Sequence, residues 1–150
     1  MSSASFPIQV DADAATIWPW IVDLSKHAVW SPSPYRVELV SGAIGEVGAR
    51  YRSVGRVPGD ANHANDVEVT SVTELRHFGF VARDEMGEFT NTFDLREGDG
   101  GTEVVFTMDS PPMTGFKALL FPIAFPLVVK PDVRKRMRML KATVEAEGAS

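Results

Sequence analysis

Three histidines are the residues of this chain best suited to proton transfer or metal binding. We expect His27 on a helix surface, His63 in a loop and His77 on the solvent face of a strand. Their spacing matches no metal-binding motif. The chain has no cysteine, which excludes thiol catalysis, disulfides and thiolate metal ligands. The sequence therefore predicts neither a metal site nor a cofactor.

Carboxylates are the other candidates for acid–base chemistry. A cyclase or dehydratase would need a carboxylate or a histidine within reach of its substrate. Asp94, Asp109 and Glu68 fall on solvent-facing positions of predicted strands. A β-bulge near Thr70–Ser71 would exchange the two faces there, because a one-residue slip reverses the direction of every following side chain. We assign no catalytic residue, and the pattern favours binding over catalysis.

Asn91 is a polar residue on an otherwise apolar strand face, between Phe89 and Phe93. Two interpretations remain open. The amide can satisfy a neighbouring backbone group or a water molecule, as most buried amides do. Alternatively, it can serve as the hydrogen-bond partner of a ligand's polar group.

Strands must position these side chains, because residues 35–110 alternate between apolar and polar positions with a period of two. Six successive runs have this pattern, and residues 6–10 add a seventh. Turn sequences separate the runs: PGDANHAN at 58–65, DEMG at 84–87 and EGDGG at 97–101. Each run has one polar, solvent-facing side, which is typical of an antiparallel sheet covered on one side only.

Helices are predicted on either side of the strand region. DADAATIWPWIVDL at 11–24 starts with capping aspartates and continues with apolar residues at helical spacing, while Pro19 should kink or shorten the helix. LSKHAVW predicts a short second helix. Near the C-terminus an apolar stripe recurs at intervals of four, three and four residues, at Val133, Met137, Leu140 and Val144. A curved sheet that wraps this last helix would leave room for a cavity.

The apolar run ALLFPIAFPLVV at 118–129 is too short to span a membrane, because a spanning helix needs about 20 apolar residues. Pro122, Pro126 and Pro131 each remove a backbone donor, so a helix here is broken or kinked. The run is either core or an adjustable wall of a binding site, with Met108 and Met113 as pliable neighbours.

The overall charge constrains the partners. The net charge of −5 argues against a nucleic-acid binder, which is usually basic. Nevertheless, six of the fifteen cations lie within twelve residues after the apolar run: Lys130, Arg134, Lys135, Arg136, Arg138 and Lys141. This cluster is either a solvated helix face or a site of transient contact with anionic membrane.

The length of 150 residues predicts a single domain over 1–150. The N-terminus MSSASFPIQV lacks the basic and apolar segments of a secretory signal, so we expect a cytoplasmic protein. The sequence does not predict an oligomeric state.

The order of elements resembles the bacterial polyketide cyclase/dehydrase and lipid-transport group of the START-like SRPBCC superfamily. The resemblance rests on IQVDADAATIWPWIVDLSKHAVWSP at 8–32, GEVGARYR at 45–52, FVARDEMGEFTNTFDLREGDGGTEVVFTM at 80–108 and the proline-broken C-terminal helix. It implies an α+β helix-grip fold, in which a seven-stranded curved antiparallel sheet wraps a long C-terminal helix and two short helices follow the first strand.

The resemblance implies an internal hydrophobic cavity but does not assign chemistry to it. Binding or transport of a small hydrophobic or amphipathic ligand, such as a lipid, polyketide or isoprenoid, is the first expectation. Polyketide cyclisation or dehydration and a protein-interaction module are the alternatives. From strand phase and the position of the apolar run we expect these ligand-binding residues: Trp30, Tyr51, Phe78, Phe80, Phe89, Asn91, Phe93, Phe106, Met108, Met113, Phe116, Leu120 and Ile123.

Overall fold

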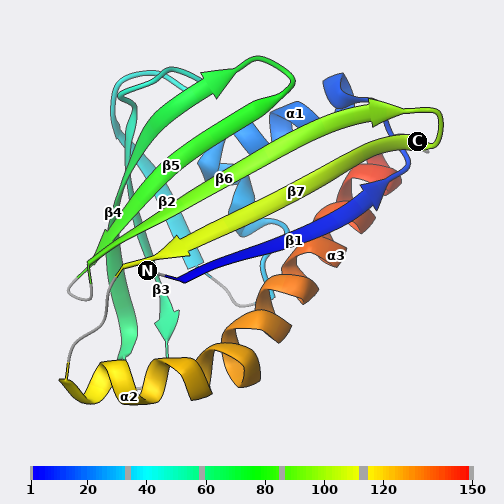
Figure 1. Cartoon of the computed structure of the whole chain (residues 1–150). Coiled ribbons are helices and arrows are strands. Elements are labelled where there is room, and N and C mark those ends of the chain that lie inside the picture. The colour runs from blue at the N-terminus through cyan, green and yellow to red at the C-terminus, as the bar shows by residue number, and fades with distance from the viewer. Residues whose placement is uncertain (1, 33–34, 58–59, 85–86, 112–114, 149–150) are drawn as a thin grey trace.

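A seven-stranded antiparallel sheet wrapped around helices forms the body of the protein (Figure 1). The computed structural model describes residues 2–32, 35–57, 60–84, 87–111 and 115–148. The strands are β1 (Ser2–Val10), β2 (Tyr35–Ser41), β3 (Arg50–Val57), β4 (Asp60–Thr73), β5 (His77–Asp84), β6 (Gly87–Gly98) and β7 (Gly101–Ser110). The helices are α1 (Ala14–Val22), η1 (Leu24–Ala28), α2 (Gly115–Ala124), η2 (Phe125–Val129) and α3 (Lys130–Gly148).

The sheet has the order β1-β7-β6-β5-β4-β3-β2, and every neighbouring pair is antiparallel. Six of the strands therefore follow one another in the sheet as they do in the chain, while β1 pairs with β7 at the far edge. With the short helices after β1 and the long C-terminal helix, this arrangement confirms the predicted α+β helix-grip fold.

One predicted turn is wrong, and a bulge considered in the sequence analysis is present. We expected a turn over 58–65, but β4 begins at Asp60, and Gly55 of β3 pairs with His63. Residues 60–65 therefore belong to a strand despite their turn-forming composition, because backbone pairing with β3 overrides the local turn preference. The β4–β5 register shifts between Val69 and Ser71, where the sequence analysis considered a bulge.

The N-terminal helices are short and capped. The Asp13 carboxylate accepts a hydrogen bond from the Thr16 backbone N–H at 2.9 Å and starts α1. The helix continues through Pro19 and ends at Val22. Asp23 then caps η1 through the Ser25 backbone N–H at 3.1 Å. η1 is a five-residue 3₁₀ helix, so residues three apart lie on one face, and both Leu24 and His27 are buried.

The C-terminal helical region changes direction where its prolines lie. Pro122 lies inside α2, and Pro126 lies in η2, a five-residue π-helical turn. Prolines and π-helical turns are the usual causes of a sharp bend, and Figure 1 shows the chain turning between α2 and α3. The predicted apolar stripe of α3 is buried, with Leu140 and Val144 fully inaccessible.

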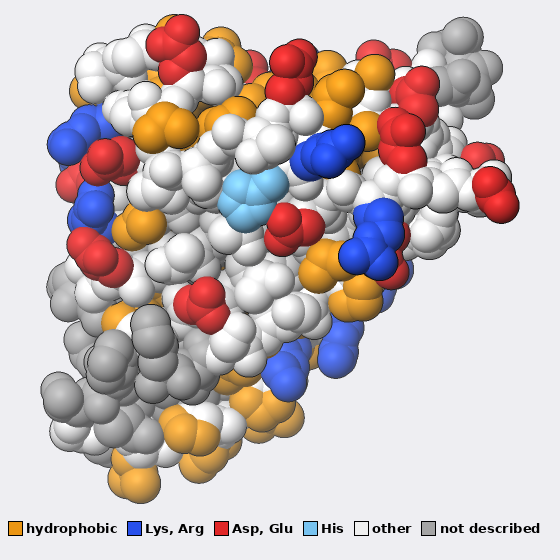
Figure 2. Space-filling model, turned by 45° about the horizontal axis from the view of Figure 1, so that its top comes forward, with side chains coloured by type: hydrophobic (Ala, Val, Ile, Leu, Met, Phe, Trp, Pro, Cys, Tyr) orange, Lys and Arg blue, Asp and Glu red, His pale blue; other side chains and the backbone are white. Residues whose placement is uncertain are grey.

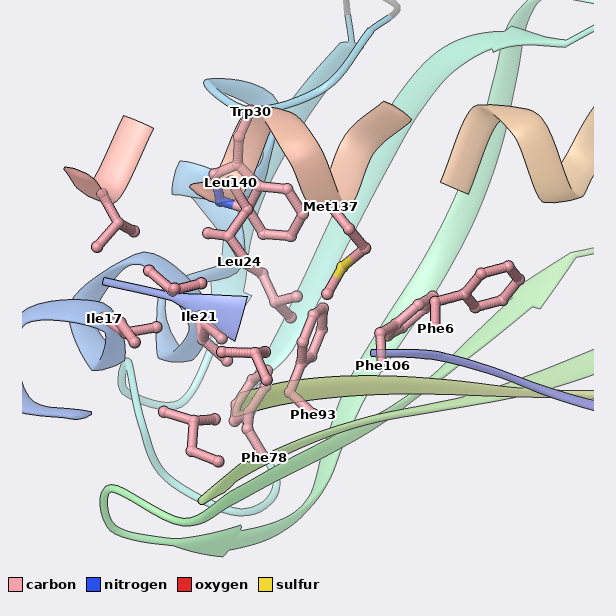
Figure 3. Packing of buried hydrophobic residues seen from close by; sticks show 14 of the residues in the cluster. Phe6, Ile17, Ile21, Leu24, Trp30, Phe78, Phe93, Phe106, Met137 and Leu140 are labelled. Carbon is pink, nitrogen blue, oxygen red and sulfur yellow. The ribbon is translucent and has the colours of Figure 1, made fainter. Parts of the chain in front are cut away.

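The core lies between the concave face of the sheet, α1, η1 and α3. Figure 3 shows Met137 and Leu140 of α3 above Phe93 and Phe78 of the sheet, with Leu24 between them and Ile17 and Ile21 of α1 beside them. Within the described ranges, no helix combines the length and hydrophobicity that crossing a bilayer requires.

Candidate functional site

A pocket of about 260 Å³ lies between the concave face of the sheet, η1 and α3. Its strand residues come from positions of one phase, since side chains two apart point to the same face. β4, for example, contributes His63, Asn65 and Val67. The apolar lining consists of Leu24, Trp30, Val37, Val67, Phe80, Ala82, Phe93, Phe106 and Met137. The polar lining consists of His27, Ser31, Tyr35, Ser53, His63, Asn65, Asn91 and Arg136.

Aromatic rings form a continuous wall of the pocket. Phe93 is central, with its ring centroid 4.7 Å from that of Phe106 and 6.0 Å from that of Trp30, which it meets edge-on. Trp30 is 1% exposed, and its Nε1–H donates to the Trp20 carbonyl oxygen at 3.2 Å. These contacts hold the rings in place, so the wall can present apolar area to a ligand without first becoming ordered.

His27 contradicts its predicted place on a helix surface. It is 5% exposed and lines the pocket, and its ring centroid lies 4.6 Å from that of Trp30. The reason is the 3₁₀ geometry of η1, which places His27 on the same buried face as Leu24.

His27 is uncharged at neutral pH. Its pKa is lowered from 6.5 to about 4, mainly by burial and also by the positive charge of Arg136, against the opposing effect of the hydrogen bond to Ile21. That bond joins Nε2 to the Ile21 carbonyl oxygen at 2.7 Å. Since a carbonyl oxygen only accepts, Nε2 carries the proton and Nδ1 is an acceptor.

His63 also contradicts its predicted place in a loop, because it lies in β4 and lines the pocket. Its Nε2 atom is 2.9 Å from Oδ2 of Asp84, at the end of β5. The side chains are only 12% and 6% exposed. A carboxylate that orients an imidazole beside a pocket is the arrangement used for general acid–base catalysis.

Arg136 brings a positive charge to the pocket, although the sequence suggested a solvated helix face. It directly precedes the buried Met137 and so lies at the border of the apolar stripe of α3. Its Cζ atom lies 5.8 Å from the centroid of the Tyr35 ring. One terminal nitrogen is 3.5 Å from Oδ2 of Asp132, one helical turn earlier. The Nε atom is buried without an acceptor among the described residues.

Asn91 lies 7% exposed in the pocket wall, and its Nδ2 donates to the Phe89 carbonyl oxygen at 3.1 Å. The hydrogen bond of the amide nitrogen therefore agrees with the first interpretation, in which Asn91 satisfies a neighbouring backbone group. The side-chain oxygen has no hydrogen-bond donor within the described part of the chain. The two interpretations are therefore compatible, since the oxygen remains available to a ligand.

The predicted ligand-binding residues fall into two groups. Five of them line the pocket together: Trp30, Phe80, Asn91, Phe93 and Phe106.

Those of the remaining predicted residues whose side chains are described lie outside this lining. Tyr51 and Phe78 are 2% and 0% exposed and belong to the core rather than to the pocket lining. Phe89 and Met108 share the inward strand phase but lie outside the lining and are partly buried. Leu120 and Ile123 of α2 are 44% and 59% exposed. Met113 and the side chain of Phe116 lie outside the described residues.

Among the polar pocket residues that the sequence analysis missed, His63 could have been found from a sequence pattern. His63, Asn65 and Val67 continue the alternation of Val67 and Val69 toward the N-terminus, so extending the strand pattern back through DANHAN would have placed His63 inward. No comparable pattern marks His27 or Arg136, because both lie on helices at the edge of an apolar face.

A second surface feature lies on α2 and η2. Leu119, Leu120, Ile123 and Leu127 are 68%, 44%, 59% and 71% exposed. In Figure 2, hydrophobic side chains gather along the lower edge, where α2 lies in Figure 1, with Lys or Arg side chains close by. Such clustering of exposed apolar residues is unusual for a surface without a partner.

The cation cluster predicted after this segment is smaller than the sequence suggested. Arg136 faces the pocket, and Lys141 donates to the Gln9 carbonyl oxygen at 2.8 Å and pairs with Glu145. Arg134, Lys135 and Arg138 are exposed, and Nζ of Lys130 lies 5.7 Å from the centroid of the Phe125 ring. The surface cluster therefore consists of Lys130, Arg134, Lys135 and Arg138.

The family model described as polyketide cyclase/dehydrase and lipid transport matches residues 1–145. No protein of curated function matches the sequence significantly. Among solved structures, a Thermus thermophilus protein has a TM-score of 0.76 at 16% identity and covers 97% of this chain and 99% of its own. A Mycobacterium smegmatis protein has a TM-score of 0.67 at 22% identity, with 97% and 92% covered.

The di-domain ARO/CYC protein StfQ from the steffimycin biosynthetic pathway has a TM-score of 0.80 at 10% identity. The match covers 99% of this chain and 52% of StfQ. At these identities the solved structures establish the fold alone.

Proposed function

We propose that this chain, which belongs to the polyketide cyclase/dehydrase and lipid transport family, binds a compact amphipathic molecule in the pocket between the sheet and α3. The observation that carries the proposal is a preformed aromatic wall facing polar groups from β2, β4 and α3 across one pocket. Ligand sites combine these two features: apolar area supplies the affinity, and a few polar groups fix the orientation.

The pocket volume indicates the size of the ligand. A volume of about 260 Å³ is near the lower limit of small-molecule sites, which range over about 300–1,000 Å³. A compact ring system therefore fits better than an extended acyl chain. Among lipids, polyketides and isoprenoids, we favour a short cyclic polyketide or isoprenoid.

The test is binding of 2-naphthol, a neutral compact probe, measured by isothermal titration. Ala82→Phe adds a ring inside the pocket and should abolish binding. Ala43→Phe adds the same ring at an exposed position outside the pocket and should leave binding unchanged. If the native protein does not bind the probe, or if both variants bind it equally, this pocket is not the ligand site.

A cyclase or dehydratase activity is the second candidate, and the His63–Asp84 pair favours it. An imidazole held by a carboxylate can remove a proton next to a ketone, and its conjugate acid can then protonate the hydroxyl that leaves as water. The expected test product is the single aromatic ring formed from a poly-β-ketone thioester just long enough to close that ring. His63→Gln should abolish this reaction and leave 2-naphthol binding intact, whereas a pure binding protein would release the thioester unchanged.

We propose that the surface formed by α2 and η2 binds an anionic membrane. Exposed leucine and isoleucine side chains could enter the headgroup region, while Arg134, Lys135 and Arg138 attract anionic lipids. The contact would be weak, since three or four basic residues contribute about 1 kcal/mol each and salt screens them. A stable protein partner on the same surface would instead support an interaction module.

A further inference from the structure

Arg136 carries a buried hydrogen-bond donor that the described part of the protein does not satisfy. Its Nε–H group is buried, yet the described residues offer it no acceptor. Buried donors in folded proteins nearly always have partners, and a charged donor without one is especially unfavourable. The guanidinium lines the pocket, so a bound molecule can supply an acceptor to its terminal nitrogens.

Asp132 does not replace this missing acceptor. Its Oδ2 atom is 3.5 Å from a terminal nitrogen of Arg136, which is long for a hydrogen bond, and its side chain is 42% exposed. The contact is an ion pair between neighbouring helical turns and leaves Nε unbonded. Asp132 therefore offsets only part of the positive charge.

The charge balance inside the pocket also favours an anion. None of the described residues that line it is an aspartate or a glutamate, and Arg136 is its one permanent cation. His27 is neutral and lies close enough to feel the charge of Arg136. Asp84 is bonded to the lining residue His63, and Asp132 forms the ion pair with Arg136 described above. An incoming anion therefore meets one cation and no opposing carboxylate in the lining.

We propose that the molecule bound in this pocket is a monocarboxylic acid whose carboxylate pairs with Arg136 and whose apolar body lies against Phe93 and Phe106. The proposal rests on the proposed function, since it names the chemical class of the ligand of the same pocket. A carboxylate matches the planar guanidinium and can accept hydrogen bonds from its terminal nitrogens. A phosphate monoester carries two charges, whereas the described lining supplies one permanent cation.

The experiment compares two probes of the same shape, 2-naphthoate and 2-naphthamide, by isothermal titration at pH 7. Native protein should bind the acid at least about tenfold more tightly than the amide, because hydrogen bonds to charged groups are the stronger ones. Arg136→Gln should remove this preference while the affinity for the amide stays within about twofold. Arg134→Gln, an exposed change two residues away, should keep the preference.

A second variant keeps the test independent of how well Arg136→Gln folds. Asp132→Asn removes the competing carboxylate, so its affinity for 2-naphthoate should rise and its affinity for 2-naphthamide should not. Equal binding of acid and amide by the native protein would overturn the carboxylate assignment while leaving the pocket function standing. Binding of neither probe would overturn both. Tighter binding of 2-naphthyl phosphate than of 2-naphthoate would show that the pocket selects a phosphate and would overturn the carboxylate assignment.

Discussion

His27 Nε2 lies 2.7 Å from the carbonyl oxygen of Ile21, and this single bond fixes the tautomer of a buried histidine at the pocket wall. The neutral ring presents Nδ1 as an acceptor. Burial, together with the nearby charge of Arg136, keeps the ring neutral.

This relationship predicts a pH dependence of stability. The pKa of His27 is about 4 in the folded protein, below the ordinary 6.5, so the unfolded chain binds more protons between these values. The free energy of unfolding should therefore fall by roughly 3 kcal/mol as the pH drops from about 6.5 to 4, in urea titrations. His27→Gln, which can still donate to Ile21, should flatten this part of the profile. An identical slope in the variant would contradict the assignment.

Phe93 and Phe78 allow a matched test of the pocket boundary. Both are buried in the same sheet face, but only Phe93 lines the pocket. Phe93→Leu and Phe78→Leu should each cost about 1–3 kcal/mol of stability in thermal or denaturant unfolding. Only Phe93→Leu should weaken 2-naphthol binding, by about 0.5–1.5 kcal/mol, because only it removes an aromatic contact with the ligand. Equal losses of affinity would place the ligand elsewhere.

Asn91→Leu tests whether the free side-chain oxygen orients a ligand. The change should weaken 2-naphthol by about 1–3 kcal/mol and spare naphthalene, because only the hydroxyl has a hydrogen bond to lose. The comparison is made by titrating both probes into the native protein and the variant. If both probes lose the same affinity, Asn91 serves the fold only.

Flotation with liposomes tests the α2–η2 surface. The protein should float weakly with anionic vesicles at low salt, and neither with neutral vesicles nor at high salt. Changing Arg134, Lys135 and Arg138 together to glutamine should abolish flotation. The matched control changes three exposed arginines of the sheet, Arg36, Arg52 and Arg96, to glutamine and should retain it. Loss of flotation in both triple variants would indicate a nonspecific charge effect.

The β6–β7 hairpin contains two adjacent glycines with different constraints. Gly101 has φ +111°, and a Cβ there would lie 2.2 Å from the Val10 carbonyl oxygen, whereas a Cβ on Gly100 would meet nothing within 4 Å. Gly101→Ala should therefore lower the free energy of unfolding by at least about 1–3 kcal/mol. Gly100→Ala should change it by less than about 0.5 kcal/mol. Similar denaturant midpoints for the two variants would refute this account.

Much of the fold follows from local pattern. Alternation along the strands predicted the inward positions of Phe80, Asn91, Phe93 and Phe106, because side-chain direction in a strand depends only on its period. The spacing from Val133 to Val144 predicted the buried face of α3, because side-chain direction in a helix likewise follows from its period. The turn expected at 58–65 failed where pairing with β3 outweighed the local preference of the residues.

The sequence by itself determined which strand and helix faces are apolar, and with them the sheet, the long helix and the aromatic wall. Only the tertiary structure decided the chemistry of the pocket. His63 meets Asp84 across 21 positions of the chain, and Arg136 approaches Tyr35 from a different element. A polar side chain at the edge of an apolar face can point to solvent or to the interior. Which one it does depends on how the sheet curves around α3, and local periodicity does not contain that information.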